Sequence, residues 1–211
     1  MKRIRHVAVV VPARDEAETV DSTMASIDRA RRALPAGVTS SCIIVLDASI
    51  DETYMVIERR TKHATRSRRD LTPPRIVRSS RGCVGAARSL GCRIAMAGAL
   101  HAPRHIWLAN TDADTTVPSH WLDAQLELAE RDVGAVAGTV ELGDDIDASL
   151  RVRVTATYEI SNDGTHRHVH GANLGVRGDI YQRAGGWRPL HTGEDHDLWG
   201  RLGRVTTGVS S

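Results

Sequence analysis

The chain has 211 residues, of which 26% are charged and 41% hydrophobic, the proportions of an ordinary globular domain. Its formal net charge of +2 at pH 7 argues against a general affinity for polyanions, so we expect no nucleic-acid partner. No apolar run approaches the length that spans a bilayer, and the first run breaks at Pro12, too early for an export signal. Cys42, Cys83 and Cys92 lack C-x-x-C spacing, which favours reduced thiols in a cytoplasmic protein over a disulfide scaffold or a zinc site.

The first half of the chain alternates between predicted strands and helices. Four segments are predicted strands: the β-branched run at residues 6–11, a second apolar run at 42–46, and two short segments at 75–78 and 105–108. Three helices are predicted between them: residues 20–30, residues 53–62, and a helix that opens at the turn 82–85 and runs to about 97. Asp15 followed by Glu18 predicts a capping box for the first helix.

The second half is built differently. Pro118 at a first helical position predicts a helix to about residue 130. Alternation over residues 136–142 predicts a half-exposed strand. Four further segments complete the prediction: a helix at 148–161, an extended segment at 167–176, a short helix from 179 toward 185, and a last helix at 194–203.

Polar clusters directly follow the four predicted strands. Strand–helix alternation at this spacing predicts right-handed crossovers and a largely parallel sheet, in which ligands bind outside the carboxyl ends of the strands. The clusters are Arg14-Asp15-Glu16, Asp47, residues 82–88, and Asp112 with Asp114. We therefore expect all four to lie along one edge of the sheet, where their repeated placement favours a binding site over separate structural turns.

Asp112 and Asp114 follow the fourth predicted strand and are separated by one residue. In an extended segment alternate side chains point the same way, so the two carboxylates could converge on one hard cation such as Mg²⁺ or Mn²⁺. The competing interpretation is a solvated turn, because Asp and Thr are ordinary turn formers.

The polar clusters suit a nucleoside diphosphate. Asp47 could accept a hydrogen bond from a base N–H, and Arg88, on the helix after the glycine turn, could reach a phosphate. A cation on Asp114 would then bridge two phosphate oxygens.

With these motifs in view, the chain resembles family 2 of the glycosyltransferases, whose members have the GT-A fold. The likeness runs over residues 7–202 and rests on five stretches in the family's order. They are residues 9–16, the base-binding turn at 44–53, the Gly-rich helix start at 82–88, the Asp-x-Asp motif at 111–114, and an acceptor-side group at 171–174, 185–187 and 194–198.

The resemblance implies a single α/β domain over residues 1–211, with a nucleotide-sugar-binding half at 1–117 and a short acceptor-side half at 118–211. It implies an inverting transfer from a nucleoside-diphosphate sugar, UDP-linked by preference, to a hydroxyl acceptor, with Mn²⁺ or Mg²⁺ as cofactor. Asp114 and Asp112 would hold the metal, Asp195 would be the general base, and Glu194 would orient the acceptor or the donor sugar. The implied nucleotide-binding residues are Pro12, Arg14, Glu16, Asp47, Gly82, Arg88 and Asp112.

The chain departs from the family pattern in places. Arg14 stands where an aromatic residue often stacks on the base, Leu46 precedes Asp47 where paired acids are frequent, and no Gln-x-x-Arg-Trp motif follows residue 203. Asp195 and Glu16 each have a structural interpretation too, as acidic residues at a helix start.

Other interpretations remain open. A non-catalytic sugar-nucleotide-binding protein is one, and a sugar-nucleotide nucleotidyltransferase is another, although residues 13–16 lack the glycines that a triphosphate loop needs. The basic stretch at 59–93 leaves contact with the inner face of a membrane possible, although such runs are more often solvated. His166, His168 and His170 could form a transition-metal clip, or a polar edge at which His170 contacts the acceptor; His196 is secondary.

Overall fold

The computed structural model describes residues 3–67, 71–141, 169–206 and 208–210. The strands are β1 (His6–Ala13), β2 (Thr39–Asp47), β3 (Arg75–Ser79), β4 (Ile106–Asn110), β5 (Ala135–Ala137), β6 (Leu174–Arg177) and β7 (Val209–Ser210). The α-helices are α1 (Val20–Arg32), α2 (Thr53–Ser67), α3 (Val84–Gly98), α4 (Trp121–Glu130), α6 (Gly178–Arg183) and α7 (Glu194–Val205), and two short 3₁₀ helices are η1 (Pro103–His105) and η2 (Gly171–Asn173).

The described strands form one seven-stranded sheet in the order β3-β2-β1-β4-β6-β5-β7. β1, β2, β3 and β4 are parallel, whereas β6 is antiparallel to both β4 and β5. The predicted α/β fold with a mostly parallel sheet is therefore confirmed, and strands from both halves of the chain share that sheet. The carboxyl ends of β1 to β4 lie at one edge of the sheet, which we call the carboxyl edge.

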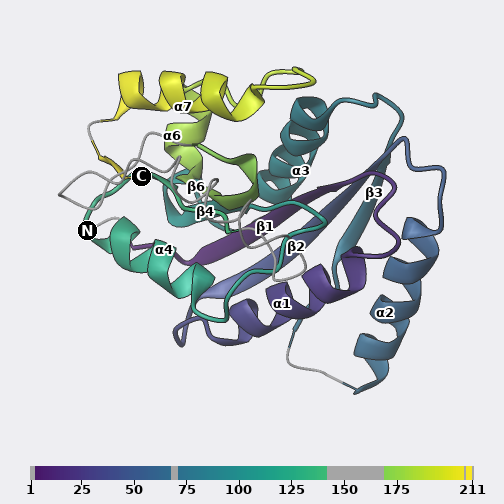
Figure 1. Cartoon of the computed structure of the whole chain (residues 1–211). Helices are drawn as coiled ribbons and strands as arrows, with labels where there is room; N and C mark the ends of the chain where they lie inside the picture. The colour runs from purple at the N-terminus through teal and green to yellow at the C-terminus, as the bar shows by residue number, and fades with distance from the viewer. Residues whose placement is uncertain (1–2, 68–70, 142–168, 207, 211) are drawn as a thin grey trace.

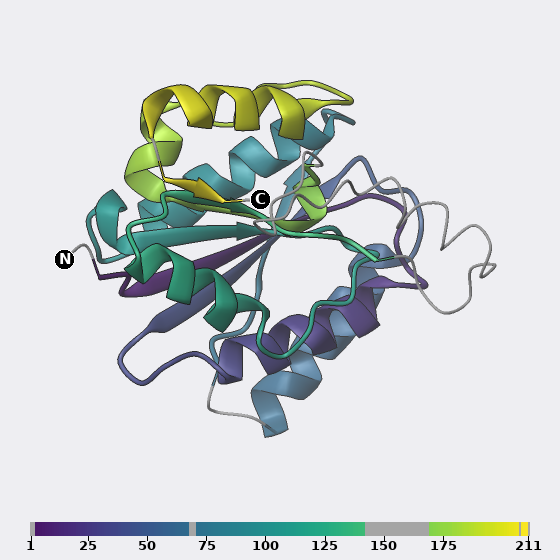
Figure 2. The same cartoon turned by 60° about the vertical axis from the view of Figure 1, so that its left-hand side comes forward.

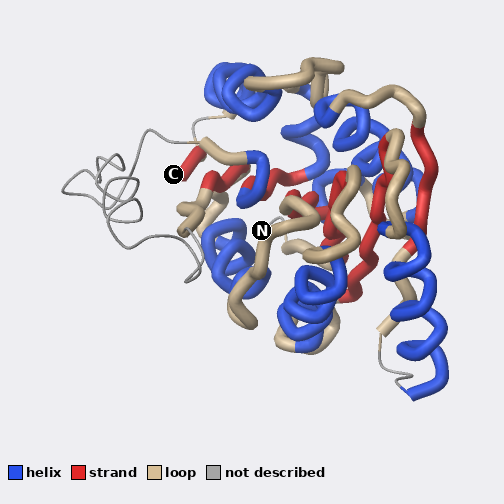
Figure 3. Tube along the Cα trace, turned by 45° about the vertical axis from the view of Figure 1, so that its right-hand side comes forward, coloured by secondary structure: helices blue, strands red, loops and turns tan. Residues whose placement is uncertain are grey.

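Helices cover both faces of the sheet (Figures 1 and 2). Strand β1 shows why, because its side chains alternate between two buried clusters. Val7, Val9 and Val11 pack in the cluster that contains residues of α1, α2 and α4, and Ala8 and Val10 pack in the cluster of α3, α6 and α7. Figure 3 shows the strands as a central layer between these two helical layers.

The core contains no Phe, so aliphatic side chains and Trp fill it. Trp107 on β4 is fully buried, and its indole Nε1–H donates to Gln125 Oε1 at 2.7 Å. Gly91 lets α3 approach β1 closely, since a Cβ at this position would lie 2.5 Å from Val10 Cγ1. The close approach of α3 sets the position of the side chains at its first turns. Cys42, Cys83 and Cys92 are buried free thiols.

Several details of the predicted elements were wrong. α1 begins at Val20 with Thr19 as its N-cap and no side-chain capping bond, so Asp15 and Glu18 do not form the predicted capping box. α4 begins at Trp121 rather than at Pro118. The predicted half-exposed strand is β5, which covers only Ala135–Ala137 and is buried at all three residues, because Val136 packs in one of the two buried clusters and Ala135 and Ala137 pack in the other. α7 continues to Val205. The predicted helix at 148–161, His166 and His168 lie outside the described residues.

Candidate functional site

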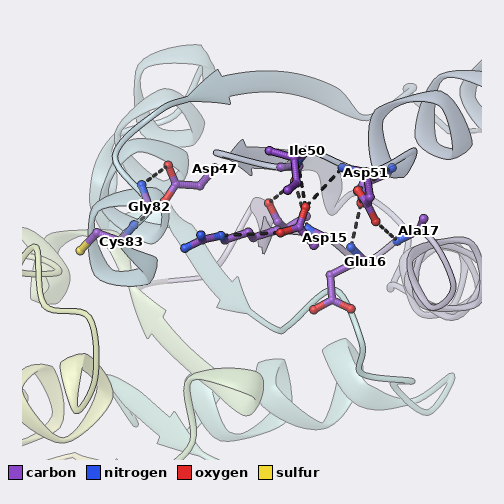
Figure 4. Close-up of polar contacts among 12 residues, drawn as sticks. Asp15, Glu16, Ala17, Asp47, Ile50, Asp51, Gly82 and Cys83 are labelled. Atoms are coloured by element: carbon purple, nitrogen blue, oxygen red, sulfur yellow. Dashed lines mark hydrogen bonds and ion pairs between the residues drawn. The ribbon is translucent and has the colours of Figure 1, made fainter.

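Two turns at the carboxyl edge are joined by reciprocal carboxylate bonds. Asp15, in the turn after β1, accepts the backbone N–H of Ile50 through Oδ1 at 2.8 Å. Asp51, in the turn after β2, accepts the N–H of Ala17 through Oδ2 at 3.0 Å. Asp15 has a φ of 55°, a left-handed conformation that Asp tolerates better than most residues. Figure 4 shows the two carboxylates between the turns, with the Glu16 side chain pointing away from them.

Asp47 ends β2 and fixes the Gly-rich turn in front of α3. Its Oδ1 accepts the N–H groups of Arg81 at 2.9 Å and Gly82 at 3.0 Å, and its Oδ2 accepts that of Cys83 at 2.6 Å. Burial acts to raise the pKa of the Asp47 carboxyl, but the bond to Ser79 and the three amide bonds outweigh burial and hold that pKa below its usual value. Both carboxylate oxygens of Asp47 are thus bound to backbone amides of this turn, whereas the sequence suggested direct contact with a base.

The amides at the start of α3 are also engaged within the protein. The carbonyl of Leu190 accepts the Gly85 N–H at 3.1 Å and the Cys83 thiol at 3.2 Å. Gly82 has a φ of 58°, which explains the glycine, and a Cβ there would lie 3.5 Å from the guanidinium of Arg14. The turn therefore places Gly82 beside Arg14, whose side chain is exposed next to the half-buried Pro12.

Arg88, one turn into α3, connects the two acidic motifs. It is 1% exposed; its Nη2 lies 2.5 Å from Asp112 Oδ1 and its Nε lies 3.5 Å from Glu194 Oε1. The guanidinium also lies over the Trp187 ring, 5.3 Å from its centroid. Its Nη1 is buried and has no hydrogen-bond partner in the described part of the chain, so it is a donor available to a ligand anion.

Gly171 makes the position of Arg88 possible. A Cβ on Gly171 would lie 2.5 Å from Arg88 Nη2, closer than a Cβ lies to any non-bonded heavy atom. From the sequence, Gly171 and Trp187 are predicted only as members of their motifs, Asp15 is predicted to cap a helix, and Asp51 has no predicted contact. All four residues lie inside the family stretches, but membership in a stretch does not predict which groups each residue contacts.

The two aspartates after β4 lie in a turn, not in the extended segment that the sequence suggested. The Thr115 N–H donates to the Asp112 carbonyl at 3.4 Å, which closes this turn. The carboxylate of Asp112 points toward Arg88, whereas Asp114 is exposed and accepts a bond from the Thr115 hydroxyl at 3.2 Å. The two acids follow the same strand but have different environments, one paired with an arginine and the other open to solvent.

The pKa of Glu16 responds to the two aspartates that follow β4. Burial raises the pKa of its carboxyl; the bond from Thr19 acts in the opposite direction, and the charges of Asp114 and Asp112 raise the pKa further. Glu16 follows β1 and the two aspartates follow β4, which is adjacent to β1 in the sheet. Carboxylates from neighbouring strands therefore gather at the carboxyl edge, as predicted.

Glu194 and Asp195 form the first turn of α7, after Gly193 in the left-handed conformation with a φ of 69°. Glu194 is buried, which raises the pKa of its carboxyl, while its backbone bond and Arg88 lower it and the charges of Asp195 and Asp112 raise it. Asp195 Oδ2 accepts the Gly171 N–H at 3.1 Å, and its Oδ1 accepts the His196 N–H at 2.8 Å. Asp195 thus lies against η2, which follows His170, while the His196 side chain is exposed.

These contacts define one site, the carboxyl-edge site, formed by Arg14, Glu16, Arg88, Asp112, Asp114, Glu194 and Asp195. Within the described residues, no three His, Cys, Asp or Glu side chains are arranged to enclose a metal ion by themselves. The donor set still fits a hard cation, because exposed Asp114 and partly exposed Asp112 supply carboxylate oxygens and leave positions for phosphate and water. The site suits a ligand that brings its own oxygens.

The Asp47 contacts predict a pH-dependent stability. Asp47→Asn replaces an acceptor oxygen by an NH₂ group that faces backbone donors, and we expect a loss of roughly 3 kcal/mol of unfolding free energy at pH 7. Because folding lowers the pKa of Asp47, its contribution is present above the unfolded pKa of about 3.9 and is lost as the pH falls through the folded pKa. Urea unfolding should show the difference from wild type narrowing below about pH 4. Glu127→Gln, an exposed change on α4, should remain within about 0.5 kcal/mol; an equal loss there would contradict the assignment.

Comparison with known proteins identifies the family of the chain. The sequence profile of the family described as Glycosyl transferase family 2 matches residues 8–190. No match was found among curated proteins. A helix long and apolar enough to cross a membrane is absent from the described parts of the chain.

Solved structures share the fold. The mannosyltransferase PcManGT from Pyrobaculum calidifontis, in complex with GDP-Man and Mn²⁺, has a TM-score of 0.67 and 23% identity, covering 99% of this chain and 54% of its own. S. aureus TarS with UDP-GlcNAc has a TM-score of 0.67 and 14% identity, covering 97% and 55%. Glucosyl-3-phosphoglycerate synthase from Mycobacterium tuberculosis, with Mn²⁺, UDP and glucosyl-3-phosphoglycerate, has a TM-score of 0.59 and 15% identity, covering 98% and 68%.

The chain thus spans about half the length of the first two of these proteins, and at these identities the likeness is one of fold. The family profile, in contrast, matches most of the sequence, including every stretch from the turn after β1 to the paired glycines before α7. The chain has the GT-A fold and belongs to glycosyl transferase family 2.

Proposed function

We propose that the chain is an inverting glycosyltransferase that moves a sugar from a nucleoside diphosphate sugar, with UDP as the preferred nucleotide, to a hydroxyl acceptor. The observation that supports it most is that the buried guanidinium of Arg88 forms ion pairs with both Asp112 and Glu194. These ion pairs join the turn after β4 to the first turn of α7. A bridge of this kind suits a transfer reaction, because the residues proposed to hold the donor's cation and those proposed to act on the acceptor have to stand close together.

On the donor side, Pro12, Arg14 and Glu16 would contact the nucleoside, and the turn held by Asp47 would lie beside it. Asp114, exposed and carboxylate-bearing, would hold a divalent cation together with Asp112. Such a cation, when bound, neutralises charge that develops on the leaving diphosphate. The Nη1 of Arg88, which has no hydrogen-bond partner among the described residues, would donate a hydrogen bond to a phosphate oxygen of the sugar nucleotide, an acceptor that a guanidinium suits.

On the acceptor side, Asp195 is the residue that we assign as general base. Its carboxylate would take the proton from the acceptor hydroxyl as that oxygen attacks the anomeric carbon and the bond to the nucleoside diphosphate breaks. The Gly171 N–H fixes Oδ2 of this carboxylate. Glu194, bound to Arg88, orients the reacting sugars rather than moving the proton.

Thermal unfolding with nucleotides tests the donor side. UDP at about 100 times its dissociation constant should add roughly 2.7 kcal/mol of stability, a shift of several degrees for a domain of this size. We expect UDP to stabilise the protein only with Mn²⁺ or Mg²⁺, GDP to stabilise it less, and Asp114→Ala to abolish the effect while Glu127→Ala keeps it. Equal stabilisation in the presence of EDTA would rule out the metal assignment, and none with any nucleotide would rule out the proposal.

A further inference from the structure

A polar hollow lies at the opposite edge of the sheet from the carboxyl-edge site. It has a volume of about 600 Å³, which suffices for a small-molecule ligand, and we call it the arginine hollow. The residues that line it are Arg131, Asp132, Arg177, Ile180, Arg183, Gly203, Arg204, Val205, Thr206 and Gly208.

Strand register fixes its location. Arg177 pairs with Trp107 near the amino end of β4, whereas Leu174, at the other end of β6, pairs with Asn110 at the carboxyl end of β4. In Figure 1 the end of α7 and the C-terminus lie on the left, and the loop after β1 lies on the right. The arginine hollow therefore shares no residue with the carboxyl-edge site.

The charges around the hollow are unbalanced. Arg177 is buried and already neutralised, because its Nη1 lies 3.1 Å from Asp132 Oδ1 and its Nε lies 2.6 Å from Asp179 Oδ1. Arg131, Arg183 and Arg204 are exposed, and they form no ion pair with the described residues. Four arginines thus stand against two aspartates, Asp132 in the lining and Asp179 beside it, and the charge of Arg183 also acts on Asp179, so the cations remain in excess among the described residues.

Helix capping accounts for only part of this pattern. Arg131 is the C-cap of α4, and Arg183 and Arg204 lie in the last turns of α6 and α7, where a cation interacts favourably with the helix dipole. That interaction is worth about 0.3–1 kcal/mol at each exposed helix end and explains each arginine singly. It does not require the three ends to meet at one hollow, where Asp132 and Asp179 offset only part of the charge of four guanidinium groups.

We propose that the arginine hollow binds a phosphate group, either on a small free molecule or on a lipid headgroup. Guanidinium forks match phosphate oxygens in pairs, and several of them around one space hold a dianion better than a single cation does. Arg177, held by Asp132 and Asp179, forms the buried side of the hollow, and the three exposed arginines would donate hydrogen bonds to the phosphate.

The double variant Arg183→Gln/Arg204→Gln tests the proposal, and Arg29→Gln/Arg93→Gln, two exposed arginines on α1 and α3, is the control with the same change in net charge. Pyrophosphate is titrated calorimetrically in EDTA, so that metal-dependent binding at the carboxyl edge does not contribute. We expect binding by wild type, by the control and by Asp114→Ala, and at least tenfold weaker binding by the double variant.

Co-sedimentation with phosphatidylglycerol vesicles, with phosphatidylcholine vesicles as reference, is the second arm. A loss confined to the double variant in either arm supports a phosphate site and identifies its source, free phosphate or membrane. Equal losses in the control variant would reduce the effect to net charge and overturn the proposal. Wild-type protein that binds neither pyrophosphate nor the anionic vesicles would also overturn it. Stabilisation by UDP with Mn²⁺ should be unchanged in the double variant, which separates this site from the proposed donor site.

Discussion

Replacement of Arg88 by Met should destabilise the protein by roughly 3 kcal/mol at pH 7, seen as a fall in melting temperature of roughly 6–12 °C. Met retains an apolar stem against Trp187 but removes the cation between Asp112 and Glu194. The Glu194 carboxylate is then buried at 6% exposure without its counter-charge, which is the costly form of a broken ion pair.

The pH dependence identifies the cause. Arg88 lowers the pKa of Glu194, which burial raises, so its removal should raise that pKa further. A carboxyl with a raised pKa destabilises the folded state once it ionises, so the deficit should be largest at neutral pH and should shrink as the pH falls toward 5. Arg93→Met, an exposed change on the same helix, should stay within about 0.5 kcal/mol. A deficit in Arg88→Met that does not vary with pH would indicate lost packing instead of an uncompensated carboxylate.

The sequence predicted which polar residues gather at the carboxyl edge, because strand ends can be located by composition. Strands β1, β2 and β4 are largely apolar and buried, and polar residues end or follow each of them, so those residues have to emerge at one edge of a parallel sheet. The family stretches then placed Arg88, Asp112 and Glu194 in that region, and the structure joins all three.

Contacts within the edge could not be predicted in the same way. Asp15 followed by Glu18 is the pattern of a capping box, but the Asp15 carboxylate instead binds N–H groups of the neighbouring turn, a partner 35 residues away. Asp47 likewise uses both oxygens on backbone amides of the next turn. Sequence spacing reports which strand end a residue follows, and a short carboxylate can bind any donor that the fold brings there.

Burial at the far side of the sheet shows the same limit. The alternation around β5 suggested one exposed face, yet Ala135, Val136 and Ala137 are all buried. Val136 packs in the cluster that contains residues of α1, α2 and α4, whereas Ala135 and Ala137 pack in the cluster of α3, α6 and α7, so both faces of β5 are covered. A period of two residues predicts an exposed face only where no helix covers that face of the sheet, and the local sequence does not report which helices do.

Asp195→Asn should lower the rate of sugar transfer by about 10²–10⁴-fold while leaving nucleotide binding intact. An amide oxygen can still accept the Gly171 N–H, so the side chain keeps its place but cannot take the proton from the acceptor hydroxyl. Release of the nucleoside diphosphate from UDP-sugars and GDP-sugars, with a panel of hydroxyl acceptors, measures the rate. Thermal shift by UDP with Mn²⁺ measures binding on the same samples.

The neighbouring change His196→Gln is the control, because His196 occupies the same helical turn with an exposed side chain and should leave the rate unchanged. If Asp195→Asn retained the wild-type rate within threefold, the general base would have to be another group, and Glu194, next to it but bound to Arg88, would be the first to test. If wild type bound the nucleotide and no sugar were transferred to any acceptor, the protein would be a binding module with the same donor pocket. The chemistry of the carboxyl edge favours the enzyme, because an acidic pair fixed by Arg88 and Gly171 opposite a cation motif is more than nucleotide binding alone requires.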